Sequence, residues 1–64
     1  MINIEELKDY LTCATEQAQL LSKNLKSEYV NEESVFAKAN HMYDIAVCDK
    51  LISYLNAMKN HLED

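Results

Sequence analysis

The 64-residue sequence contains no glycine, no proline, no tryptophan and no arginine. Tight turns, phosphate-binding loops and most two-residue β-hairpins use glycine, so its absence argues against sheet-rich folds and nucleotide-binding loops. Leucine, alanine, glutamate, lysine and glutamine, which all favour helices, are abundant. The sequence therefore predicts an all-α chain.

Cysteine is also scarce, with Cys13 and Cys48 as the two examples. No apolar run is long enough to span a membrane, and no signal-peptide pattern is visible. We therefore expect a cytoplasmic protein with reduced thiols. A single domain of this size buries only about 60% of its unfolded surface and usually needs a disulfide, a metal or a partner chain. Since nothing indicates a cofactor, we expect a partner chain to stabilise it.

Positive charge is limited to six lysines, against eleven acidic residues, for a net charge of −5. Nucleic-acid-binding surfaces usually carry a basic stripe, so this balance argues against nucleic acid as the main partner.

A first helix is predicted over about residues 4–26. Asn3 is a candidate N-cap, and Glu6 stands three residues later, in the capping-box position. Apolar residues then recur at a spacing of three and four, which predicts the seam of a helical hairpin. These seam residues are Ile4, Leu7, Leu11, Ala14, Ala18, Leu21 and Leu25.

The segment at residues 27–31 predicts a turn, because polar residues cluster there and the apolar repeat lapses. Asn31 is the candidate cap of a second helix over about residues 32–62, with Glu32 and Glu33 in its first turn. The alternative is one continuous helix in a long coiled coil.

The second helix carries a broader apolar surface than the first. At about 100° per residue, its aromatic and aliphatic residues form a line that one neighbouring helix cannot cover. Soluble monomers avoid large exposed apolar patches, so we expect this line to contact another chain. The simplest arrangement is a homodimer of hairpins forming a four-helix bundle, and a dissimilar helical protein is the alternative. The expected interface residues are Phe36, Tyr43, Val47, Leu51, Tyr54, Leu55 and Met58.

His41, Asp44 and Cys48 share one side of this helix and resemble a chemical site. However, His41 and Cys48 lie about 10 Å apart along the axis, which is too far for one zinc ion without ligands from a second helix or subunit. No base or oxyanion donor is placed to activate Cys48 as a nucleophile. We therefore predict no catalytic, cofactor or metal site. A metal bridging two subunits and a disulfide between Cys13 and Cys48 are the alternatives.

The predicted function is that of a small, non-enzymatic protein–protein interaction module, such as a regulator, co-chaperone, adaptor or inhibitor. One alternative is an RNA-binding four-helix-bundle dimer that uses the polar side of the first helix, with Lys8, Gln19, Lys23 and Lys26. Another is an acidic inhibitor that mimics nucleic-acid charge through Glu28, Glu32 and Glu33. In outline alone, the chain is similar to plasmid copy-number RNA-binding proteins and to small co-chaperones of type III secretion needle subunits, and a phage or plasmid source fits this outline. No shared motif transfers a functional residue from either group.

Overall fold

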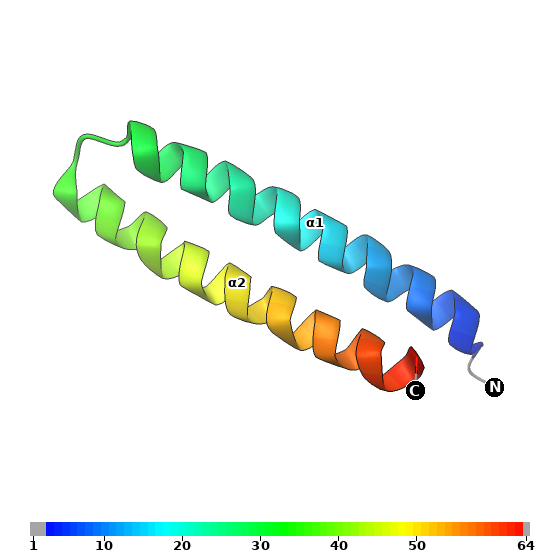
Figure 1. Cartoon of the computed structure of the whole chain (residues 1–64). Helices are drawn as coiled ribbons and strands as arrows, with labels where there is room; N and C mark the ends of the chain where they lie inside the picture. Colours follow the sequence, from blue (N-terminus) through cyan, green and yellow to red (C-terminus); the bar gives the residue numbers. More distant parts are fainter. Residues whose placement is uncertain (1–2, 64) are drawn as a thin grey trace.

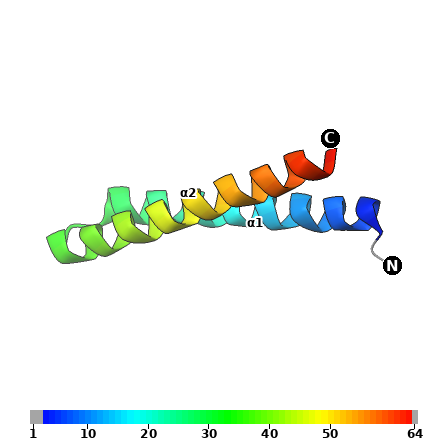
Figure 2. The same ribbon diagram turned by 90° about the horizontal axis from the view of Figure 1, so that it is seen from below.

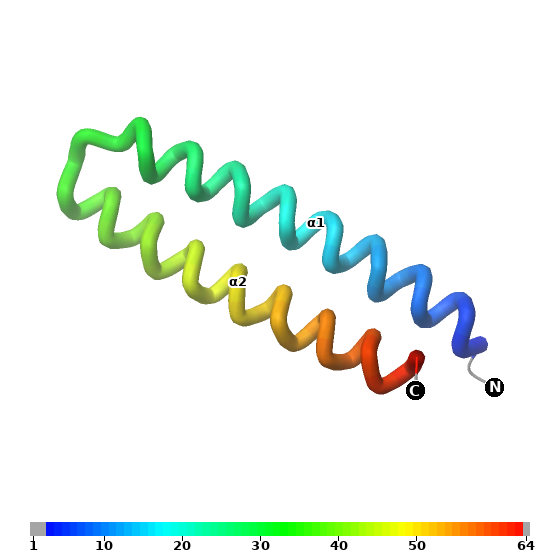
Figure 3. Tube along the Cα trace, in the orientation of Figure 1, coloured from blue at the N-terminus to red at the C-terminus, as the bar shows by residue number. Residues whose placement is uncertain are grey.

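The computed structural model describes residues 3–63 as two antiparallel helices, α1 (Ile4–Asn31) and α2 (Val35–Glu63) (Figure 1). The start of α1 and the end of α2 lie at the same end of the molecule, as the Cα trace in Figure 3 shows. No strand occurs among the described residues. The all-α hairpin predicted from the sequence is confirmed, and the single continuous helix is excluded.

The predicted N-cap of α1 is confirmed. The Asn3 side-chain oxygen accepts a hydrogen bond from the Glu6 backbone N–H at 3.2 Å, which satisfies one of the unpaired donors of the first turn. One turn later, the Tyr10 hydroxyl donates to the Glu6 carboxylate at 2.7 Å. This hydrogen bond raises the pKa of Tyr10 above its usual value of 10.0.

The turn lies later in the chain than the sequence predicted. Helix α1 continues through residues 27–31, because these residues are compatible with a helix and neither glycine nor proline interrupts them. The helix ends where Glu32 takes an extended backbone conformation, with φ −82° and ψ 131°. The side chain of Ser34, rather than that of Asn31, then caps α2 by accepting from the Ala37 N–H at 3.4 Å.

Small and polar side chains fill the centre of the contact between the helices. Thr15, Ala18 and Ser22 of α1 are buried, and so is Cys48 of α2. The Cys48 thiol donates to the Ala18 carbonyl oxygen at 3.2 Å, and the Thr15 hydroxyl donates to the Leu11 carbonyl oxygen at 2.7 Å. Small residues at a helix contact allow the two backbones to approach closely. The two helices cross each other in the view of Figure 2. This seam consequently buries little apolar area.

The observed seam differs from the predicted one at three positions. Leu7, Leu11, Ala18 and Leu25 are buried or half-buried between the helices, whereas Ile4, Ala14 and Leu21 are exposed. The seam instead includes Thr15 and Ser22, each one residue after a predicted member. Since one residue rotates the helix by about 100°, Ala14 and Leu21 lie on the flank of the contact.

Candidate interaction surface

The hairpin has two broad sides, and the groove between the helices differs in chemistry on each. On one side, a groove of about 330 Å³ is lined mainly by apolar residues of both helices. On the opposite side, a groove of about 410 Å³ is lined mainly by polar residues. The groove between the two helices is therefore apolar on one side of the hairpin and polar on the other.

The apolar groove continues into the exposed line of α2. Leu21 and Leu25 of α1 face Val47 and Leu51 of α2 across the groove. A second hollow of about 280 Å³ shares Val47 and Leu51 and extends the surface to Tyr54. We call the whole surface the apolar face. It comprises Ala14, Leu21 and Leu25 of α1 with Phe36, Tyr43, Val47, Leu51, Tyr54 and Met58 of α2.

The large side chains of the apolar face are exposed to solvent in the single chain. The six members from α2 are between 50% and 86% exposed, and Phe36 is the most exposed of them. In contrast, the buried apolar residues of the described chain are Leu11, Ala18 and Cys48, of which only leucine is large. Most of the aromatic and aliphatic bulk of α2 therefore lies outside the hairpin contact.

The structure separates Leu55 from the other residues expected to contact a partner. Leu55 is half-buried, and so are Ile45 and Ile52, at the spacing of three and four that includes Cys48. These four residues form the side of α2 that packs on α1. The repeat of Ile45, Cys48, Ile52 and Leu55 could have been found in the sequence, but the larger aromatic residues on the neighbouring side obscured it.

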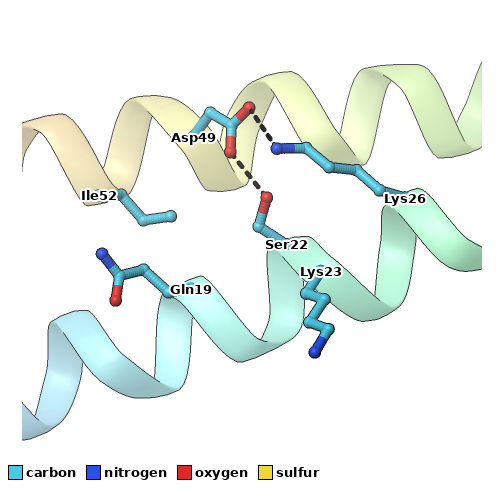
Figure 4. A pocket seen from close by; sticks show the side chains of 6 residues that line it. All are labelled: Gln19, Ser22, Lys23, Lys26, Asp49 and Ile52. Atoms are coloured by element: carbon cyan, nitrogen blue, oxygen red, sulfur yellow. Dashed lines mark hydrogen bonds and ion pairs between the residues drawn. The ribbon is translucent and has the colours of Figure 1, made fainter.

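The opposite side of the hairpin, which we call the polar groove, centres on Asp49. Its carboxylate accepts a hydrogen bond from Ser22 at 2.7 Å and forms an ion pair with Lys26 at 3.7 Å (Figure 4). Gln19, Lys23 and Ile52 complete the lining, and Lys23 extends away from Asp49 in this view. The buried Ser22 hydroxyl is thereby satisfied, which removes the cost of placing it in the seam.

The RNA-binding alternative relies on four residues, and three of them line the polar groove: Gln19, Lys23 and Lys26. The fourth, Lys8, lies outside this groove and forms an ion pair with Glu5 at 3.7 Å. However, the carboxylate of Asp49 stands among these residues and pairs with one of the two lysines. A carboxylate in this position opposes the binding of phosphate groups.

The turn brings together a histidine and two acidic residues. His41 of α2 lies with Nδ1 3.9 Å from a Glu28 carboxylate oxygen and Nε2 3.7 Å from a Glu32 carboxylate oxygen. Glu32 also accepts from the Ser34 backbone N–H at 3.0 Å. That hydrogen bond, supported by His41, lowers the pKa of Glu32 below its usual value of 4.5 and outweighs the opposing effect of desolvation. Two of the three acidic residues of the turn thus have local structural roles.

The three residues that resembled a chemical site are not brought together. His41 faces the acidic residues of the turn, Asp44 lines the apolar groove and Cys48 is buried against Ala18. Within residues 3–63, no group of three potential ligands is arranged to hold a metal ion. Cys13 is exposed, and neither cysteine is in a disulfide. Neither helix, over the same residues, is long and apolar enough to cross a membrane.

Comparisons of the chain with protein-family models, with curated proteins and with solved structures gave no match.

Proposed function

We propose that this protein is a small, non-enzymatic protein–protein interaction module that binds a helical partner through the apolar face. The partner completes a four-helix bundle around the side chains that the hairpin leaves exposed, and a homodimer is the simplest form of that bundle. A regulator, co-chaperone, adaptor or inhibitor can act in this way.

One observation carries the proposal: large side chains of the apolar face are exposed, while small and polar ones fill the centre of the seam. Burial of apolar area is the main force that stabilises a fold, and this hairpin places little of its apolar area in its own interior. Exposed contiguous apolar patches rimmed by polar residues are typical of interaction sites. Tyrosine, phenylalanine and methionine, which are enriched at interfaces, all occur in this face.

Two single substitutions test the proposal. Tyr43→Asp places a charge in the apolar face, whereas Met42→Asp places the same charge on an adjacent exposed apolar residue. At about 100° per residue, Met42 is turned away from the apolar face towards the side of Asp49. Both proteins would be compared with the wild type by native mass and by binding of a fluorescent dye that reports exposed apolar surface.

We expect Tyr43→Asp to weaken assembly by at least about tenfold and Met42→Asp to leave it nearly unchanged, since only the first buries an unpaired charge. If the free protein is a monomer awaiting another protein, it should bind the dye, and Tyr43→Asp should reduce that binding. The proposed function would be contradicted if the wild type is a monomer that binds no dye, and if Tyr43→Asp changes neither the native mass nor the dye binding.

A further inference from the structure

The amount of exposed surface indicates how large the missing partner contact is. The chain exposes 5145 Å². A compact monomer of 7.4 kDa is expected to expose about 4,200 Å². The excess, about 900 Å², is close to the roughly 800 Å² that each partner contributes to a standard stable interface. A contact over one broad side of the 49 × 17 × 14 Å hairpin accounts for such an area.

The line of residues on α2 is symmetric about Val47. Tyr43 precedes Val47 by four residues and Leu51 follows it by four, while Phe36 and Met58 lie eleven residues before and after it. A two-fold axis through Val47, perpendicular to α2, therefore places Tyr43 and Phe36 of one copy opposite the flexible aliphatic side chains of Leu51 and Met58 of the other. Such a self-complementary surface is what a two-fold dimer requires.

The same axis pairs Tyr54, the third aromatic residue of the apolar face, with a polar residue. Tyr54 and Asn40 lie seven residues after and before Val47, and both are exposed in the single chain. In the two-fold arrangement, Tyr54 of one copy lies opposite Asn40 of the other. The phenol hydroxyl can then donate to the amide oxygen, which satisfies a polar group within the interface.

A second two-fold arrangement stacks the two hairpins with both turns at the same end of the bundle. It gives a poorer chemical match between the contacting residues. In that arrangement, α2 of one copy packs on α1 of the other rather than on α2. The flank of α1 beside the apolar groove alternates Ala14 and Leu21 with Gln17, Asn24 and Glu28. Placing the aromatic line of α2 against these polar residues would desolvate them without evident partners.

We infer that the occupant of the apolar face is a second copy of this chain, with the two α2 helices antiparallel about a two-fold axis at Val47 and the two turns at opposite ends. The inference rests on the proposed function, because it names the partner of the same surface.

Cysteine cross-linking tests the arrangement. Val47→Cys, Phe36→Cys and Met58→Cys would each be introduced into the full chain carrying Cys13→Ser and Cys48→Ala, and oxidised under mild conditions. We expect Val47→Cys to form a covalent dimer by itself. Phe36→Cys should not, because its two copies lie about 33 Å apart along the helix axis. A mixture of Phe36→Cys and Met58→Cys should cross-link again.

Circular dichroism and native mass would show whether the chain carrying Cys13→Ser and Cys48→Ala still folds and assembles. If it does not, the same three positions are tested in Cys13→Ser alone, where Cys48 remains buried, and distances between spin labels replace the cross-links. Self-cross-linking of Phe36→Cys, or failure of Val47→Cys in a dimeric protein, would overturn the two-fold axis. A wild-type chain that stays monomeric at millimolar concentration would overturn the second copy as partner. The proposed function is then judged separately by dye binding to the apolar face.

Discussion

At the scale of single residues, Ala18 controls how closely the helices approach. Its side chain is buried beside the Cys48 thiol, which donates to the Ala18 carbonyl oxygen. We expect Ala18→Leu to destabilise the protein by about 1–3 kcal/mol, because the added atoms must force the backbones apart. Chemical denaturation at a fixed protein concentration measures this change.

The matched control is Ala46→Leu, which adds the same atoms at an exposed position on α2. It should change the free energy of unfolding by less than about 0.5 kcal/mol. Equal effects of the two substitutions would mean that Ala18 is not at the helix contact.

Glu32, which lies in the turn, makes the stability of the folded protein depend on pH. Its pKa in the folded protein lies below the usual 4.5, mainly because the Ser34 N–H donates to its carboxylate. A lowered folded-state pKa means that its contribution is present above about pH 4.5 and is lost as the pH falls through the folded-state value. Glu32→Gln should therefore flatten the fall in thermal midpoint on acidification.

Glu33→Gln is the control for this pH dependence, since it removes the same charge from an adjacent exposed residue. Thermal unfolding between about pH 3 and pH 7 compares the two variants with the wild type. If Glu33→Gln flattens the profile as much as Glu32→Gln does, net charge rather than the turn hydrogen bond determines the effect.

At the scale of elements, the first turn of α1 depends on a side-chain cap. Removing the hydrogen bond between Asn3 and the Glu6 N–H by Asn3→Ala should cost about 1 kcal/mol of stability. Asn56→Ala, at an exposed position inside α2, should be neutral or slightly stabilising, because alanine is the better helix former there. A cost at Asn56 equal to that at Asn3 would argue against the capping role.

The type and order of the elements could be predicted from the sequence, whereas two details could not. The start of α1 was recognisable because the capping signal of Asn3 and Glu6 is local. The end of α1 was not, since residues 27–31 tolerate both helix and turn, and the tertiary contact of His41 with Glu28 and Glu32 lies outside any local pattern.

The helix seam was predicted only in part for a related reason. Apolar periodicity selects the largest residues, and in this chain several of those lie beside the contact rather than in it. Thr15 and Ser22 are buried because their hydroxyl groups find acceptors, in one case the Asp49 carboxylate of the opposite helix. Hydropathy alone does not reveal such pairs. The exposed line of α2 was more accessible to prediction, because an apolar surface too broad for one neighbour is a property of the sequence itself.

At the scale of the whole molecule, stability should depend on protein concentration. The hairpin keeps most of its large apolar side chains outside its own seam, so association through the apolar face would stabilise the folded state by mass action. We expect the thermal midpoint of the wild type to rise with concentration and that of Tyr43→Asp to be lower and nearly constant. A wild-type midpoint independent of concentration would indicate that the hairpin is stable alone.

Sedimentation equilibrium of the reduced wild-type protein at micromolar concentration distinguishes a self-assembled bundle from a free hairpin. We expect a species of twice the 7.4 kDa chain mass, which dissociates when Tyr43 is replaced by aspartate. A well-folded species of 7.4 kDa, unchanged by that substitution, would contradict this expectation.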